Sequence, residues 1–99
     1  MANLRIEFHP SAVTEAEGAR DWYAERSGSA AKGFLHELDN ALLRVAEAPE
    51  RWPEFEYGTR RLLFRRFPFA LIYRVTEARI QVVAVAHQRR KPGYWHSRT

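Results

Sequence analysis

With 99 residues, the chain can enclose one hydrophobic core but not two, so we expect a single domain over residues 1–99. The absence of cysteine excludes a disulfide framework and a thiolate zinc site. No apolar run approaches the roughly 20 residues of a membrane span, and the N-terminus lacks the apolar core of a signal peptide, so we expect a cytoplasmic protein that does not enter the membrane.

Positive charge is concentrated in the second half of the chain. Residues 1–56 contain 6 Lys/Arg and 11 Asp/Glu, a balance of −5, whereas residues 57–99 contain 10 Lys/Arg and Glu77 alone, a balance of +9. A surface of this kind suits an acidic partner, either nucleic-acid phosphate or an acidic protein segment. A solvated arginine-rich surface without a partner is the alternative that composition leaves open.

The first half of the chain predicts one strand and two helices. Residues 4–8 alternate apolar and charged as in a half-buried strand, which Pro10 ends. We expect Ser11 and Ser29 to be the N-caps of the two helices, the first ending near residues 27–28 and the second before Pro49. The side chains expected to face the core are Ala12, Ala16, Ala19, Trp22 and Tyr23 in the first helix, with Glu15 facing away, and Ala31, Phe34, Leu35, Leu38, Ala41, Leu42 and Val45 in the second.

The second half predicts three short strands, at residues 60–67, 69–75 and 79–86. Their short connections favour an antiparallel meander. In the last strand we expect Ile80, Val82, Ala84 and Ala86 to face the helices, and His87 to emerge on the opposite, exposed face beside a basic tail. The element order strand, helix, helix, strand, strand, strand predicts a two-layer α+β fold, with an antiparallel helix hairpin on one face of a mainly antiparallel sheet.

Several short motifs are specific only in combination and in their order. They are Trp22-Tyr23, Phe34-Leu35 to Val45, Pro49 with Trp52-Pro53, Gly58-Thr59-Arg60-Arg61, Phe67-Pro68-Phe69 with Ile72-Tyr73-Arg74, and Ala84-Val85-Ala86-His87 leading to Arg89-Arg90 and Tyr94-Trp95. Together they resemble the RelE/ParE superfamily of type II toxin-antitoxin toxins, also labelled plasmid stabilisation proteins.

The resemblance implies a growth-inhibiting toxin that needs no cofactor. It also implies a cognate antitoxin, disordered when free, whose acidic or amphipathic segment would suit the basic half of this chain. A toxin dimer or a toxin–antitoxin hetero-oligomer is compatible with this picture.

The superfamily has a RelE-like branch of ribosome-dependent mRNA endonucleases and a ParE-like branch that inhibits DNA gyrase. Cleavage of RNA by its 2′-hydroxyl needs a base, cations for the phosphate and an acid. By resemblance to the nucleases, Arg61 occupies one lysine position, and Arg90 and Tyr94 match the arginine and tyrosine after the last strand. Leu63 and Ala70 stand where a second lysine and an arginine would be, and neither can move a proton or hold a phosphate.

The leading hypothesis is therefore a ParE-like toxin that binds gyrase and is not an enzyme. Under the nuclease alternative, His87 would replace the missing base, because imidazole exchanges protons near neutral pH, and Arg65 would replace the missing cation. A third hypothesis is a non-toxic basic module that binds nucleic acid.

The candidate residues for contact with the target or the antitoxin are Arg61, Arg65, His87, Arg89, Arg90, Tyr94 and Trp95. Four of them, Arg61, His87, Arg90 and Tyr94, would be catalytic under the nuclease alternative. Two structural alternatives remain open: Tyr94 and Trp95 could fold back over the sheet edge, and Arg61 could pair with a helix carboxylate such as Glu37. No metal site is predicted, because His36, Glu37 and Asp39 do not converge on one point of a helix.

Overall fold

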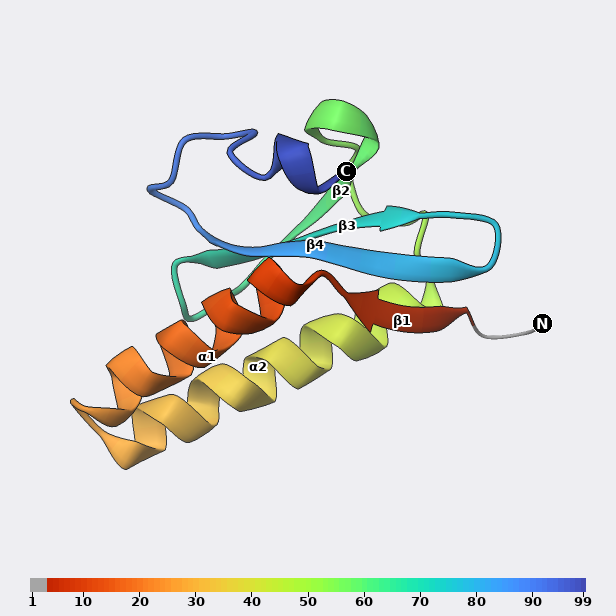
Figure 1. Ribbon diagram of the computed structural model, residues 1–99. Coiled ribbons are helices and arrows are strands. Elements are labelled where there is room, and N and C mark those ends of the chain that lie inside the picture. The colour runs from red at the N-terminus through yellow and green to blue at the C-terminus, as the bar shows by residue number, and fades with distance from the viewer. Residues whose placement is uncertain (1–3) are drawn as a thin grey trace.

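Two helices lie against one face of a four-stranded sheet in the computed structural model, which describes residues 4–99 (Figure 1). The elements are β1 (Arg5–Phe8), α1 (Pro10–Ala24), α2 (Gly28–Glu47), β2 (Arg60–Leu63), β3 (Phe69–Val75) and β4 (Arg79–His87), with short 3₁₀ helices at Glu56–Gly58 and His96–Arg98. This order and the helix hairpin on the sheet confirm the predicted α+β fold. Among the described residues, no helix is long and apolar enough to cross a membrane.

The strands are arranged in the order β1-β4-β3-β2. β2, β3 and β4 form the predicted antiparallel meander, whereas β1 lies parallel to β4 and pairs with it from Arg5 beside Arg79 to Phe8 beside Val82. A parallel pair needs a long connection, which the helix hairpin and the meander provide. The pairing of β1 stops at Val82, and within residues 4–99 no strand pairs with the rest of β4 on that side.

The N-caps of both helices lie two residues before those predicted from the sequence. His9 caps α1 in place of Ser11, and its Nδ1 accepts a hydrogen bond from the Ser11 backbone N–H at 3.0 Å. Pro10 occupies the first turn, where its missing N–H is not needed. Ser27 caps α2 in place of Ser29, with its Oγ accepting from Ala30 N–H at 3.3 Å.

The main core lies between the hairpin and the sheet. Its helical members are Ala12, Ala19, Phe34, Leu38, Ala41 and Val45, with Ala16, Tyr23 and Leu42 packed at its margin. The prediction that Trp22 is buried is wrong, since it is 51% exposed, with the Arg26 guanidinium 3.4 Å from the centroid of its ring. Tyr23 fills the space instead, packing on Phe34 and Phe67. Leu35 is also more exposed than predicted.

A β-bulge in β4 reverses the alternation of its side chains. Ile72 pairs with Ala84 and Tyr73 with Val82, which leaves Val83 without an opposite residue. Ile80 and Val82 face the helices as predicted, but beyond the bulge Val85 takes that face, and Ala84 and Ala86 pack on the other. The expectation that Ala84 and Ala86 lie under the helices is therefore wrong, because an inserted residue shifts the period of two by one.

The second face of the sheet is covered by the C-terminal tail, which lies across the sheet from the helices (Figure 1). Trp95 is only 2% exposed and packs with Ala70, Ile72 and Val83, and its ring stacks on Phe55 at 5.5 Å between centroids. This burial favours the alternative in which Trp95 folds back over the sheet. A tail with one large ring covers this face because small residues line the strands beneath it.

Tyr73 connects β3 to the loop after α2. Its side chain is fully buried, and its hydroxyl donates a hydrogen bond to the Pro49 carbonyl. Burial raises the pKa of Tyr73 to about 12, against an opposing contribution from Arg60. Because only the neutral phenol is tolerated there, its contribution to stability is complete below the ordinary tyrosine pKa of about 10 and is lost as the pH rises through about 12.

We therefore expect the free energy of unfolding to fall between about pH 10 and pH 12, and to fall less steeply in a Tyr73→Phe variant. At neutral pH the same variant should lose about 1 kcal/mol, because the Pro49 carbonyl loses its donor. Urea unfolding at pH 8, 10 and 11 would measure both effects. Equal pH slopes for the two proteins would contradict this assignment.

Candidate functional site

Two depressions meet at the end of β4, one on each face of the sheet. The larger, of about 430 Å³, lies between α1 and the ends of β3 and β4 and has a mainly apolar wall that includes Ala19, Tyr23, Phe69 and Val85. The smaller, of about 240 Å³, lies under the tail and is lined by Arg61, Leu63, Ala70 and Trp95 among others. His87, Arg90 and Tyr94 line both. We call these the helix groove and the tail groove.

The structure brings together most of the predicted site residues, but not Arg65. Arg61 lines the tail groove, with its guanidinium 4.2 Å from the centroid of the Phe55 ring. Arg65 lies in a separate depression beside Glu37 and Arg44. There the Glu37 carboxylate accepts the backbone N–H groups of Arg65 and Arg66. The alternative that Glu37 pairs with Arg61 is therefore wrong, because Glu37 is engaged by this turn.

His87 lies on the helix side of the sheet, and the prediction that it emerges on the opposite face is wrong. The bulge in β4 turns it to the same side as Val85, where it lines the helix groove and meets the Phe69 ring edge-on at 5.0 Å. Its Nδ1 accepts a hydrogen bond from the Arg89 backbone N–H at 3.0 Å. Nδ1 of His87 is therefore engaged by the backbone of the turn that follows β4.

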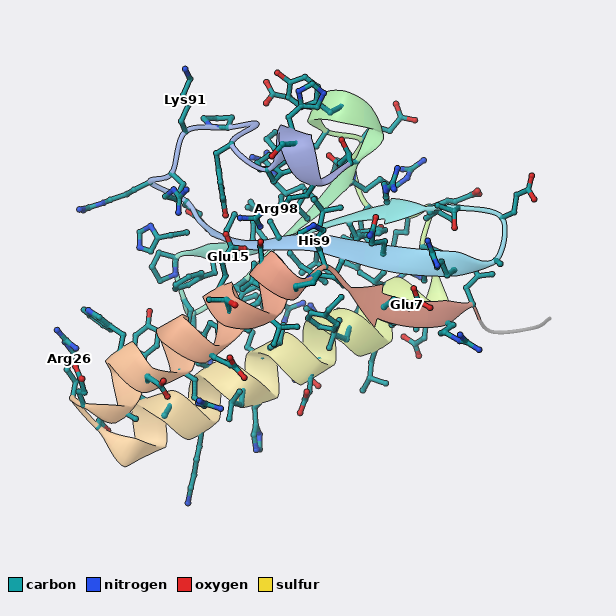
Figure 2. All side chains as sticks on the ribbon, in the orientation of Figure 1. Glu7, His9, Glu15, Arg26, Lys91 and Arg98 are labelled. Carbon is teal, nitrogen blue, oxygen red and sulfur yellow. The ribbon has the colours of Figure 1, made fainter. Side chains whose placement is uncertain are left out.

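The arginines after β4 form an exposed turn, which we call the basic turn (Arg89, Arg90 and Lys91). The Arg90 backbone N–H donates to the His87 carbonyl at 2.9 Å, and its guanidinium lies 3.9 Å from the centroid of the Tyr94 ring. Lys91 points away from the domain (Figure 2). Within residues 4–99, no carboxylate lies within 4.0 Å of any of these three cationic groups.

A partly buried ionic cluster fixes the tail beside the helix groove, with Glu15 of α1 at its centre. Its carboxylate accepts the Tyr94 hydroxyl at 2.7 Å, the Val85 backbone N–H at 3.0 Å and two donors of Arg98, each at 3.0 Å. Arg98 also donates to the Val83 carbonyl at 3.1 Å. The labelled side chains of Glu15 and Arg98 point toward each other from α1 and the tail (Figure 2).

The surroundings in the cluster raise the pKa of Tyr94 and of Arg98. Burial, followed by the hydrogen bond to Glu15, raises the pKa of Tyr94 well above its ordinary value. The hydrogen bond to Glu15 raises the pKa of Arg98. The side chains of Glu15 and Arg98 are each only 16% exposed, so this is a largely desolvated ion pair with its hydrogen bonds satisfied. Tyr94 therefore holds its proton toward Glu15.

Sequence reasoning missed Glu15 and Arg98. The helical pattern predicts that Glu15 faces outward, but its position three residues after Ala12 and four before Ala19 puts it next to the buried stripe. That spacing was the available signal. No three His, Cys, Asp or Glu side chains of residues 4–99 are grouped as a metal ion would require.

Removing the Glu15 carboxylate should destabilise the fold strongly. Glu15→Ala leaves Arg98 without its counter-ion and the Val85 N–H without an acceptor, which we expect to cost roughly 3 kcal/mol. Glu17→Ala, on the exposed side of the same helix, is the matched control and should stay within about 0.5 kcal/mol of the parent. Urea unfolding of both variants would measure the two losses in the free energy of unfolding. Similar losses would contradict the stabilising role of the Glu15 cluster.

Comparisons with known proteins agree with this architecture. The family model described as "ParE toxin of type II toxin-antitoxin system, parDE" matches residues 6–92. A chain in the solved structure titled "Chromosomal ParDE TA system from P. aeruginosa" superimposes with a TM-score of 0.73 at 19% identity, covering 85% of this chain and 95% of that chain, a likeness that concerns the fold alone. A search of curated proteins found no match. Because the family model spans most of its length, the chain belongs to the family of ParE toxins of type II toxin-antitoxin systems.

Proposed function

We propose that this toxin inhibits growth by binding a protein target, DNA gyrase, and that a cognate antitoxin neutralises it. The observation that most supports binding over RNA cleavage is the engagement of the two groups best suited to move protons. His87 accepts from Arg89 through Nδ1, and Tyr94 donates to Glu15. A general base or acid must instead reach the reacting atoms.

The composition of the tail groove supports the same proposal. Leu63 and Ala70 both line it beside Arg61 and Arg90, so the positions where nuclease relatives would carry cations form an apolar wall. Two arginines remain to meet the charge that develops on a phosphate during cleavage. Such charge needs several converging donors for effective stabilisation, whereas an apolar wall with a cationic rim suits a protein surface.

The helix groove and the basic turn together suit an antitoxin segment of mixed character. The groove offers apolar contacts from Ala19, Tyr23 and Phe69, and the basic turn next to it offers unpaired cations. A disordered segment with apolar side chains followed by acidic ones would bury its apolar side chains in the helix groove. Its acidic side chains would pair with the cations of the basic turn. Proteolysis of such a segment would release the toxin, in keeping with a role in plasmid stabilisation.

The test uses the full chain, purified with the neighbouring antitoxin and then freed from it. We expect the freed toxin to inhibit supercoiling by gyrase, and Arg90→Glu to weaken the inhibition at least about 10-fold, because the rim charge is reversed. Lys32→Glu, the same charge change at an exposed position of α2, is the control and should have little effect.

The alternatives give different results in parallel assays on the same preparation. Codon-spaced cuts in a translated message would overturn the gyrase proposal in favour of the RelE-like nuclease. Normal growth of cells that express the folded toxin alone, together with a steep loss of nucleic-acid affinity on adding salt, would favour the non-toxic binding module.

A further inference from the structure

Arg90 is the cation that lines both grooves, and its guanidinium contacts an aromatic ring. It is exposed, and within residues 4–99 it has no ion pair. Its guanidinium is placed by stacking on the ring of Tyr94, 3.9 Å from the centroid. A free arginine side chain loses considerable rotamer entropy on binding, so prior stacking reduces the entropy cost of using it.

The ring of Tyr94 is itself oriented by the hydrogen bond of its hydroxyl to Glu15. The Tyr94 hydroxyl donates to Glu15 Oε2 at 2.7 Å, and the same carboxylate is held by the Val85 N–H and by Arg98. Arg98 also balances the charge of Glu15, which lines the same groove as Arg90. The Glu15 carboxylate therefore orients the Tyr94 ring, while its charge is paired with Arg98 and not with Arg90.

We propose that Glu15 is a positioning residue of the binding surface: it holds the Tyr94 hydroxyl, Tyr94 presents its ring, and the ring sets the Arg90 guanidinium where the two grooves meet. The group that pairs with the Arg90 guanidinium is a carboxylate of a protein partner. That last step rests on the proposed function, whereas the way Arg90 is held rests on the contacts alone.

The first experiment needs no partner. In the full chain with ¹⁵N-labelled arginine, the Arg90 Nε–H signal, identified by its loss in Arg90→Lys, should show a ring-current shift and a high heteronuclear NOE. Tyr94→Leu should abolish both by removing the ring. Glu15→Gln and Tyr94→Phe keep the ring and should lower both, since each weakens or removes the hydrogen bond that orients it.

Glu17→Gln is the matched control for Glu15→Gln and should leave the Arg90 signal unchanged. Should Glu15→Gln fail to fold, Tyr94→Phe decides, because it removes only a hydroxyl. An Arg90 signal that keeps its shift and its NOE in these variants would overturn the proposal, even if the variants are less stable, since a purely structural Glu15 would affect stability without freeing Arg90.

The second experiment measures inhibition of gyrase supercoiling. Glu15→Gln and Arg90→Met should each weaken it about 10-fold, and the double variant should be no weaker than Arg90→Met, because both changes remove the same interaction. Losses that multiply to about 100-fold would overturn the coupling. A toxin that fails to inhibit gyrase, while Arg90 still loses its ring-current shift in Glu15→Gln, would overturn the proposed target and support the positioning role.

Discussion

Among the residues that the structure describes, no strand lies along the free edge of β4 beyond Val82, and two side chains bond its backbone groups instead. β1 ends its pairing at Val82, after which the Val85 N–H donates to Glu15 and the Val83 carbonyl accepts from Arg98. Buried backbone groups without partners are costly, so this end of the strand depends on the ion pair. Since one partner comes from α1 and the other from the tail, the same pair joins three segments that are far apart in the sequence.

The bulge in β4 and this ion pair act together on the site. The bulge turns Val85 and His87 toward the helices and presents Ala84 and Ala86 to the tail, which closes over them with Trp95. The ion pair then fixes the tail in that position through Tyr94 and Arg98. The exposed cations of the basic turn, which lie between β4 and the tail, are thereby held at both ends.

Carboxylates of the acidic half are used inside the fold, which leaves cations of the basic half available. Glu15 and Glu37, both on helices, accept backbone N–H groups from the second half of the chain, and their side chains are 16% and 13% exposed. The basic turn has no such partner among the described residues. Arg89, Arg90 and Lys91 are therefore one place where the positive charge of the second half is exposed at the surface, and arginine is enriched in protein interfaces.

Much of the architecture could be predicted from the amino-acid sequence. The periods of 3.6 and 2 separate two helices from four strands, the short connections determine the meander, and the stripe from Phe34 to Val45 identifies the helix that packs most deeply. The order of these elements and the motifs around them indicate the superfamily. The positive charge of the second half indicates that the tail is basic. These properties are local, so each can be read within a short window of the chain.

The site itself was decided by tertiary structure. A single unpaired residue, Val83, moved His87 to the opposite face, because a shift of one position reverses every later side chain in a strand. The burial of Trp95 follows from Ala70, Ile72 and Val83, which no short sequence window around it contains. Glu15 looked like one more solvated carboxylate, and it is internal only because β1 stops short and Arg98 returns from 83 residues away to meet it.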